Sequence, residues 1–358
     1  EINTSSTYFG TGLQMAASGG HQDTVELLLQ YSPDINAQGG YYGTAIQEAA
    51  AGGYKNIVKL LLQHGADTNV QGGRYGNAIR GAAAGGYKDI VELLLQHDAD
   101  INAQNIHYNT AIQVVAARGY KDTAELILDH GTGINTLKYY DTAVQVATAG
   151  GHKDTVELLL QHGADINTQG EHYGTAIQVA VVRGHKNIVE LLLQYGADIN
   201  VQNGYYGTAI QAAANLGHED IVKLLLQHGA DINAQEGYLG TAIQAAATRG
   251  HDKIVEILLQ HGADINVQNE HYGTALQEAA AGGHKNIVEL LLQHGADINA
   301  HGGYYGTAIQ EAASRGNEDI VKFLLEHGAN INVQGGHYGS AIQAAAAGSH
   351  KDTIELLL

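Results

Sequence analysis

The sequence contains no cysteine, and this absence excludes several kinds of chemistry. Without a thiol there can be no disulfide framework, no thiolate nucleophile and no thiolate metal site. The absence fits a reducing compartment, and we predict a cytoplasmic protein. A chain without cysteine is also tolerated outside the cell, so this feature alone does not decide the location.

Basic residues and long apolar runs are also scarce. Eighteen lysine and arginine residues stand against 37 aspartate and glutamate residues, so the formal net charge is -19. This charge repels phosphate backbones and anionic lipid headgroups. Apolar runs such as residues 176–182, which include Gln178, are far shorter than the roughly 18 to 20 residues that span a bilayer. We therefore predict no nucleic-acid partner and no membrane segment, and we see no signal peptide in the first residues.

One segment is repeated along the whole chain. The motif Thr-Ala-Ile-Gln, or a close variant, begins at residues 11, 44, 77, 110, 142, 175, 208, 241, 274, 307 and 340. Successive copies are 33 residues apart, except that Thr142 follows Thr110 after 32. A fixed period of this size is typical of a solenoid. We predict a single domain of about eleven repeats over residues 1–358, partial at both ends as if cut from a longer array, with an irregular junction at residues 129–142.

Each repeat is predicted to contain two short helices. Thr44 and Gln47 form a capping box, in which each side chain satisfies a backbone amide of the other residue. Small residues follow the cap and let neighbouring helices approach closely, until a Gly-Gly pair ends the helix. A second helix is predicted over residues 55–63, with His64 in its last turn and Gly65 as the left-handed residue after it.

Two repeats depart from this scheme. Asn77 still caps its helix, but Arg80 stands where the other repeats have glutamine, so the reciprocal half of the box is absent. Asp98 replaces the glycine that ends the second helix, and we expect a local strain on the order of 1 kcal/mol there.

These residues resemble the ankyrin repeat, whose pattern is Gly-x-Thr-Pro-Leu-His-x-Ala-Ala, then Gly-His, a Val-Val-x-Leu-Leu-Leu helix and Gly-Ala-Asp-x-Asn-Ala. Gly217-His218 and residues 229–234 match this pattern closely. Alanine replaces the family's proline, as at Ala45, and glutamine replaces its histidine, as at Gln47. Because glutamine can take over the capping role, the resemblance still implies an all-α ankyrin-repeat solenoid. Stacked antiparallel helix pairs, outward hairpin-like loops and a concave binding surface are expected.

The loop tips carry a recurring aromatic pair just before the capping residue. Residues 205–211, Tyr-Tyr-Gly-Thr-Ala-Ile-Gln, resemble the tips of long ankyrin arrays in large fungal proteins, including the sensor ends of NACHT-type signalling proteins. Tyrosine suits a recognition surface because it offers a large rigid contact area with a polar end. The alternative is that these rings stack along the solenoid and order the loops. The candidate partner-binding residues at the tips are Tyr41, Tyr42, His172, Tyr205, His271 and Tyr304.

Positions that vary from repeat to repeat are the second candidate surface. A residue that the fold requires should be the same in every copy, so a variable position is available for another role. The position four residues after the cap carries Glu48, Glu278 and Glu311, and the position eight after it carries Arg118, Arg183, Arg249 and Arg315. The resemblance places both columns on inner helices that face the concavity, where mixed charges could encode a partner. The alternative is neutral variation on a solvated face.

Twenty histidines suggest metal binding, but their spacing argues against it. They occur once per repeat at the start of the second helix, as at His218, and once at its end, as at His64. Equivalent residues of stacked repeats lie roughly 8 to 10 Å apart, too far for shared ligands at about 2.1 Å from zinc. No Ser-His-Asp or phosphate-loop arrangement occurs. We predict no metal site, no cofactor and no enzymatic activity.

Two functions remain. The first is a non-catalytic protein–protein interaction module, the recognition or scaffold part of a larger protein, which binds a protein partner through its concave face and tyrosine-rich tips. The second is a structural array whose uncapped terminal repeats associate end to end with other copies, because a heterologous contact that does not close produces filaments.

Overall fold

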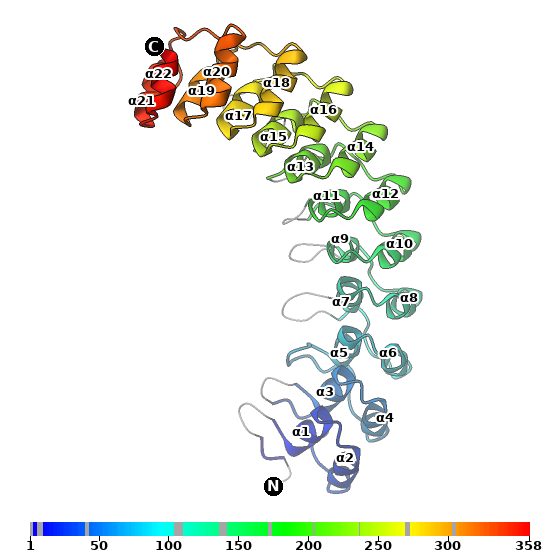
Figure 1. Cartoon of the computed structure of the whole chain (residues 1–358). Coiled ribbons are helices and arrows are strands. Elements are labelled where there is room, and N and C mark those ends of the chain that lie inside the picture. Colours follow the sequence, from blue (N-terminus) through cyan, green and yellow to red (C-terminus); the bar gives the residue numbers. More distant parts are fainter. Residues whose placement is uncertain are drawn as a thin grey trace. The chain divides into compact units, whose positions relative to one another are not determined.

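The computed structural model describes residues 3–5, 10–39, 43–103, 110–135, 142–170, 174–202, 205–235, 237–268, 273–302 and 306–358. Within them the chain forms 22 helices and no strand, as predicted for an all-α repeat array (Figure 1). The chain divides into two compact units, unit 1 (residues 1–176) and unit 2 (residues 177–358), which are described separately. The single domain over residues 1–358 stays a prediction.

Each repeat contributes a first and a second helix. The first helices are α1 (Gly12–Ser18), α3 (Ala45–Ala51), α5 (Ala78–Gly85), α7 (Ala111–Arg118), α9 (Ala143–Ala149), α11 (Ala176–Val182), α13 (Ala209–Leu216), α15 (Ala242–Arg249), α17 (Ala275–Gly282), α19 (Ala308–Ser314) and α21 (Ala341–Ala347). The second helices are α2 (Gln22–Leu29), α4 (Lys55–Gln63), α6 (Lys88–Leu95), α8 (Lys121–Asp129), α10 (Lys153–Gln161), α12 (Lys186–Gln194), α14 (Glu219–Gln227), α16 (Asp252–Gln260), α18 (Lys285–Gln293), α20 (Glu318–Glu326) and α22 (Lys351–Leu357).

The capping box fixes where each first helix begins. At α15 the Thr241 backbone amide donates to the Gln244 side chain at 2.7 Å, and the Gln244 backbone amide donates to the Thr241 hydroxyl at 3.4 Å. At α5 the cap is one-sided, as predicted, because the Asn77 side chain accepts from the Arg80 amide at 3.0 Å and nothing returns the bond. Local sequence therefore determines the start of these helices.

The second helix and its end also agree with the prediction. α4 spans Lys55–Gln63 and buries Ile57, Val58 and Leu61. The His64 ring nitrogen Nδ1 lies 2.8 Å from the Leu60 carbonyl, and Gly65 has φ +86°. The histidine ring thus adds a second contact to a carbonyl that already accepts from the His64 backbone amide at 3.2 Å, and glycine adopts the left-handed conformation that follows.

A column of rings packs on glycine between neighbouring repeats. In unit 2 the Nε2 of His251 lies 3.2 Å from the Asn215 carbonyl of the preceding repeat, and its ring covers Gly217. A Cβ on Gly217 would lie only 2.8 Å from that ring, and the residue has φ +79°. In unit 1 the rings of Tyr54 and Tyr87 cover glycine in the same way. This histidine column therefore has a structural role.

Backbone turns after the second helices are joined by asparagine. The Asp67 amide donates to the Asn36 side chain at 2.8 Å, and the Asp67 side chain accepts from Asn69 at 2.8 Å. At the irregular junction, Gly133 replaces this aspartate, and its amide still donates to Asn102 at 2.8 Å. The first half of residues 129–142 therefore keeps the regular ladder. The tip at residues 136–141, where we expect distortion, lies outside the described residues.

Within each unit the helices pack in two rows (Figure 1). In unit 1, α1, α3, α5, α7 and α9 pack in succession, and in unit 2, α13, α15, α17, α19 and α21 do the same. Alanine dominates the contacts between first helices, and the second helices cover this row with isoleucine, valine and leucine. The close approach of the first helices brings side chains of successive repeats together, which positions the candidate site.

Candidate functional site

The glutamates four residues after the cap do not stand on a solvated face. Glu48 is 7 % exposed and Glu311 is 2 % exposed, while Glu278 is half-buried. At the same position Val179 and Ala212 are fully buried. The column therefore lies between neighbouring first helices, and the solvated-face alternative is wrong for Glu48 and Glu311. Partner binding by these glutamates stays a prediction.

Each of these glutamates lies beside a residue of the preceding repeat, the one that stands seven positions after the cap of that repeat. There Ser18 hydrogen-bonds to Glu48. The Thr248 hydroxyl lies 3.3 Å from Oε2 of Glu278 and 2.8 Å from the Gln244 carbonyl, so its single proton is shared between these two acceptors. The backbone amide of Gly273 donates to the other oxygen of Glu278, also at 3.3 Å. Ala281 occupies the equivalent place beside Glu311 and has no hydroxyl group to offer. The Oε1 atom of Glu311 is buried and has no hydrogen-bond partner, and the same is true of the Oε1 atom of Glu48.

Burial shifts the ionisation of all three carboxyl groups. The pKa of Glu311 is raised from the usual 4.5 to about 7, chiefly by desolvation, with the Glu278 charge adding to this shift and the Arg315 charge opposing it. Desolvation also raises the pKa of Glu48 to about 7, against the Ser18 hydrogen bond and the Arg74 charge. Burial raises the pKa of Glu278 as well, against its bonds from Gly273 and Thr248.

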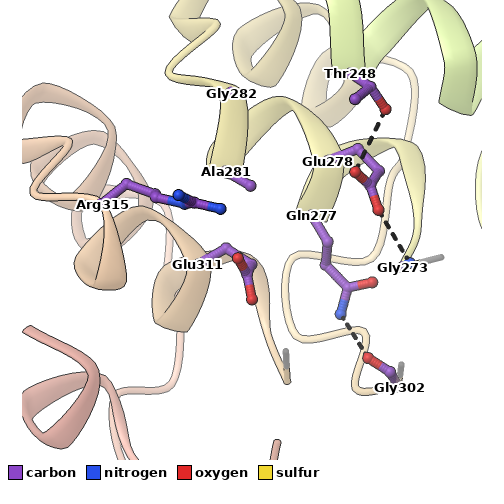
Figure 2. A pocket seen from close by; sticks show the side chains of 9 residues that line it. All are labelled: Thr248, Gly273, Gln277, Glu278, Ala281, Gly282, Gly302, Glu311 and Arg315. Atoms are coloured by element: carbon purple, nitrogen blue, oxygen red, sulfur yellow. Dashed lines mark hydrogen bonds between the residues drawn. The ribbon is translucent and has the colours of Figure 1, made fainter. Parts of the chain in front are cut away.

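Glu278 and Glu311 line one pocket of about 200 Å³ in unit 2. Figure 2 shows Glu311 and Arg315 projecting from the α19 region toward α17, while Glu278 is held on the far side by Thr248 and Gly273. The rest of the lining is Thr248, Gly273, Gln277, Ala281, Gly282 and Gly302. Small residues around two carboxyl groups and one guanidinium leave an open polar space on the row of first helices.

The predicted arginines all lie exposed at or just after the ends of first helices. Arg315 joins the pocket, and the Arg249 Nε donates to Asn215 of the preceding repeat at 3.1 Å. Arg118 lies in unit 1 and Arg183 in unit 2, and neither lines the pocket. The structure thus brings Glu278, Glu311 and Arg315 together and leaves the other predicted charges separate.

The loop tips are described only in part. Tyr41, Tyr42, His172, His271 and Tyr304 lie outside the described residues. Tyr205 is 58 % exposed and stacks on Tyr238 of the next repeat, with ring centroids 6.0 Å apart, and it meets Tyr206 edge-on at 5.2 Å. This ring both stacks along the array and presents an exposed face, so it is compatible with either interpretation of the tips.

Metal ligation and membrane insertion find no support in the described part of the chain. No group of three or more histidine, aspartate or glutamate side chains is arranged there to hold a metal ion. Every helix in the same residues is too short or too polar to cross a bilayer.

Sequence reasoning missed the residues that shape the pocket, above all Ala281 and Thr248. The relevant signal is a relation between two columns. Ser18 stands seven residues after the cap of one repeat, and Glu48 stands four residues after the cap of the next. Thr248 and Glu278 have the same relation. Glu311 follows an alanine instead. Comparing the columns in successive repeats would have shown that Glu311 is the one of these three glutamates with no hydroxyl residue at that position in the preceding repeat.

Comparison with known proteins agrees with this architecture. A family model described as ankyrin repeats (3 copies) matches residues 1–72, 79–170, 169–236, 211–302, 243–335 and 301–358. Among solved structures, the chain is similar to the crystal structure of the human ASB11 ankyrin repeat domain, with a TM-score of 0.55 and 24 % sequence identity. That similarity covers 62 % of this chain and 99 % of the other, and it concerns the fold. A search of curated proteins found no match.

Proposed function

Because the chain belongs to the ankyrin-repeat family, we propose that it is a non-catalytic module that binds a protein partner through its first helices and loop tips. Ankyrin repeats are generally protein–protein interaction modules, and this fold is typically not enzymatic. The observation that carries the proposal is the polar pocket of Glu278, Glu311 and Arg315, with a buried carboxyl oxygen that no side chain or backbone amide satisfies.

The scaffold and the variable positions separate clearly. Capping threonines, box glutamines and the ring column satisfy the backbone of the chain itself, as Thr241, Gln244 and His251 do. At the variable positions, Arg249 bonds to the Asn215 side chain, and the buried Oε1 atom of Glu311 has no hydrogen-bond partner. Binding surfaces often contain residues that lower the stability of the free protein or do not contribute to it, because the partner supplies their missing contacts.

The charge of the chain favours a basic partner. A formal net charge of -19 attracts positively charged surfaces and accelerates their association at low salt. The exposed Arg183 and Arg249 then serve discrimination, since they repel a partner whose positive charges are misplaced.

Site-directed photo-crosslinking tests this proposal. A benzophenone side chain is placed at position 216 or 314, both half-buried at the ends of first helices in unit 2, and at the exposed positions 256 and 326 of second helices as controls. We expect one protein to be captured from the first helices and not from the second. The captured protein is then purified and its affinity measured directly.

The affinity measurement uses a variant that leaves the pocket intact. Combined replacement of Arg183, Arg249 and Tyr205 by alanine is expected to weaken binding at least tenfold, as the loss of about 1.4 kcal/mol from one or two energetically important contacts implies. Crosslinks confined to the second helices, or unchanged affinity of the triple variant, would contradict the proposed surface.

End-to-end association is the second candidate function. The apolar side chains that it would use are exposed on described helices, namely Met15 on α1 at 54 %, Leu27 on α2 at 53 % and Leu356 on α22 at 40 %. Light scattering of residues 1–358 over a range of concentrations tests it. A mass that rises with concentration supports assembly, and a constant monomer mass eliminates this function.

A further inference from the structure

We propose that the pocket between α17 and α19 receives the ammonium group of a lysine side chain from the partner, with Glu311 and Glu278 as its acceptors. This inference rests on the proposed protein-binding function and names the chemistry that the partner must present. Its central feature is Glu311, which is 2 % exposed, lines the pocket and has an oxygen without a hydrogen-bond partner.

The missing bond has a local cause. Thr248 supplies a hydroxyl group to Glu278 across one junction between repeats, but Ala281 supplies none to Glu311 across the next. The space that a hydroxyl would fill is part of a pocket of about 200 Å³. Since one water molecule occupies about 30 Å³ of liquid, this volume has room for an ammonium group and part of its aliphatic stem.

The pocket has a net negative charge of one unit when both of its carboxyl groups are ionised. With both carboxyl groups ionised, Glu278 and Glu311 carry two negative charges, and Arg315 supplies one positive charge. A single ammonium group would make the site neutral. It would also donate to the free oxygen of Glu311, which removes the cost of a buried acceptor without a partner.

The arrangement of acceptors favours an ammonium over a guanidinium group. Both oxygens of Glu278 already accept bonds, from Thr248 and Gly273, so the remaining acceptor sites belong to separate carboxyl groups on α17 and α19. An ammonium group has three donors around a point and can address separated acceptors. A guanidinium prefers two oxygens of one carboxylate in a single plane. An anion is disfavoured by the two carboxyl groups.

The paired glutamates occur at one junction of the sequence. Glutamates occur four residues after the cap in successive repeats only at Glu278 and Glu311, and Glu48 is followed by Gly81 at that position. Glu48 also has a buried Oε1 atom without a hydrogen-bond partner, although Ser18 bonds to its carboxyl group. It differs from Glu311 because no second glutamate stands at this position in either neighbouring repeat. The lysine site is therefore a property of this one junction and not of the repeat.

The test uses the peptide acetyl-Ala-Ala-Lys-Ala-Ala-amide as the probe, with its acetyl-lysine and arginine analogues for comparison. Carboxyl-labelled glutamate lets NMR follow the titration of Glu311 in the intact chain. We expect saturating lysine peptide to lower the Glu311 midpoint by at least about one pH unit, as binding to the ionised form requires. Because burial places the free pKa near 7, peptide affinity should rise about tenfold between pH 6 and pH 8.

Two variants and one control make the test specific. Glu311→Gln should weaken peptide binding and reduce its pH dependence to the part that Glu278 contributes. Ala281→Thr should also weaken peptide binding while leaving every charge in place, because its hydroxyl takes the position that Thr248 has beside Glu278. Ala117→Thr makes the same change at an exposed equivalent position in unit 1 and should leave binding unchanged. Circular dichroism confirms that each variant is folded.

The outcomes separate this inference from the proposed function. If no peptide shifts Glu311 while the crosslinked partner still binds, the lysine site is wrong and protein binding stands. If the lysine peptide binds but crosslinking captures no protein, the pocket is a cation site and the proposed function fails. Equal binding of the acetyl-lysine analogue, or tighter binding of the arginine analogue, overturns the assignment to an ammonium group.

Discussion

The side-chain amide of Gln244 donates to the backbone carbonyl of Val267, 3.1 Å away and 23 residues further along the chain. The same amide donates to the Gly273 carbonyl at 2.6 Å, while its oxygen accepts from Thr241 at 2.7 Å. One buried side chain therefore caps its own helix and fastens the loop that leads to the next repeat. Gln47, Gln145, Gln211, Gln277 and Gln310 make the same two loop bonds.

Replacing Gln244 by methionine, which has a similar volume, should destabilise unit 2 by about 3 kcal/mol or more. The change leaves one buried amide and two carbonyls without their partner, each at a cost of about 1 to 3 kcal/mol, partly offset where water can enter. Urea unfolding followed by circular dichroism measures this change. Gln343, the exposed equivalent in α21, is the control, and its replacement by methionine should cost clearly less because, among the described residues, its side chain bonds only to the exposed Ser340 amide, which water can satisfy.

Arg80 shows the consequence of losing this glutamine. It is 6 % exposed, its Nε and Nη1 atoms have no hydrogen-bond partner, and burial lowers the pKa of its guanidinium to about 10. We expect Arg80→Gln to stabilise unit 1 by about 1 to 3 kcal/mol, because it removes a buried unpaired charge and restores the box with Asn77. Chemical denaturation is the measurement. A loss of stability would mean that the long arginine side chain fills space which glutamine leaves empty.

Asp98 carries the strain expected from its sequence position. Its φ is +60°, in the left-handed region where the other repeats mostly place glycine, although Ser32 shares this conformation at +52°. Asp98→Gly should stabilise the chain by about 0.5 to 1 kcal/mol. Asp98→Asn should stabilise the chain by about 0.3 kcal/mol, because it removes a negative charge from a helix C-terminus. If both variants gain equally in thermal unfolding, charge and not backbone strain is the cause.

The helices could be predicted because their signals are local. A capping threonine and its glutamine are three residues apart, and the apolar pattern of residues 55–63 lies within one helix, which α4 reproduces. The two loop bonds of each glutamine could not be predicted, since they join residues 23 and 29 positions apart whose register only the folded repeat establishes.

The candidate site was predictable only in its parts. Glu278, Glu311 and Arg315 stood out because they vary inside a fixed frame. The burial of the two glutamates could not be predicted in the same way, because it depends on how closely the alanine residues let the first helices approach. The pocket forms where Ala281 of one repeat lies beside Glu311 of the next. When each column of the repeat is considered by itself, these two neighbouring positions are treated as if they were independent.

Glu311 should make the stability of unit 2 depend on pH. Burial raises its folded pKa to about 7 from the usual 4.5, with the Glu278 charge adding to the shift and Arg315 opposing it. Between these two values the folded state holds a proton that the unfolded state has released. The free energy of unfolding therefore falls as pH rises from about 4.5 through 7, and the full cost of the ionised carboxylate is present above that range.

Glu311→Gln removes this cost, so it should stabilise the chain more in alkaline than in acidic solution. We expect the gain in unfolding free energy to be about 2 kcal/mol larger at pH 8 than at pH 5, because each unit of pKa shift corresponds to about 1.4 kcal/mol. Denaturation curves of the variant and the parent at both pH values measure it. Glu326→Gln, an exposed change on α20, should show no such difference. A gain that is equal at both pH values would mean that Glu311 is already satisfied as a carboxylate, which would also remove the vacancy that a lysine is proposed to fill.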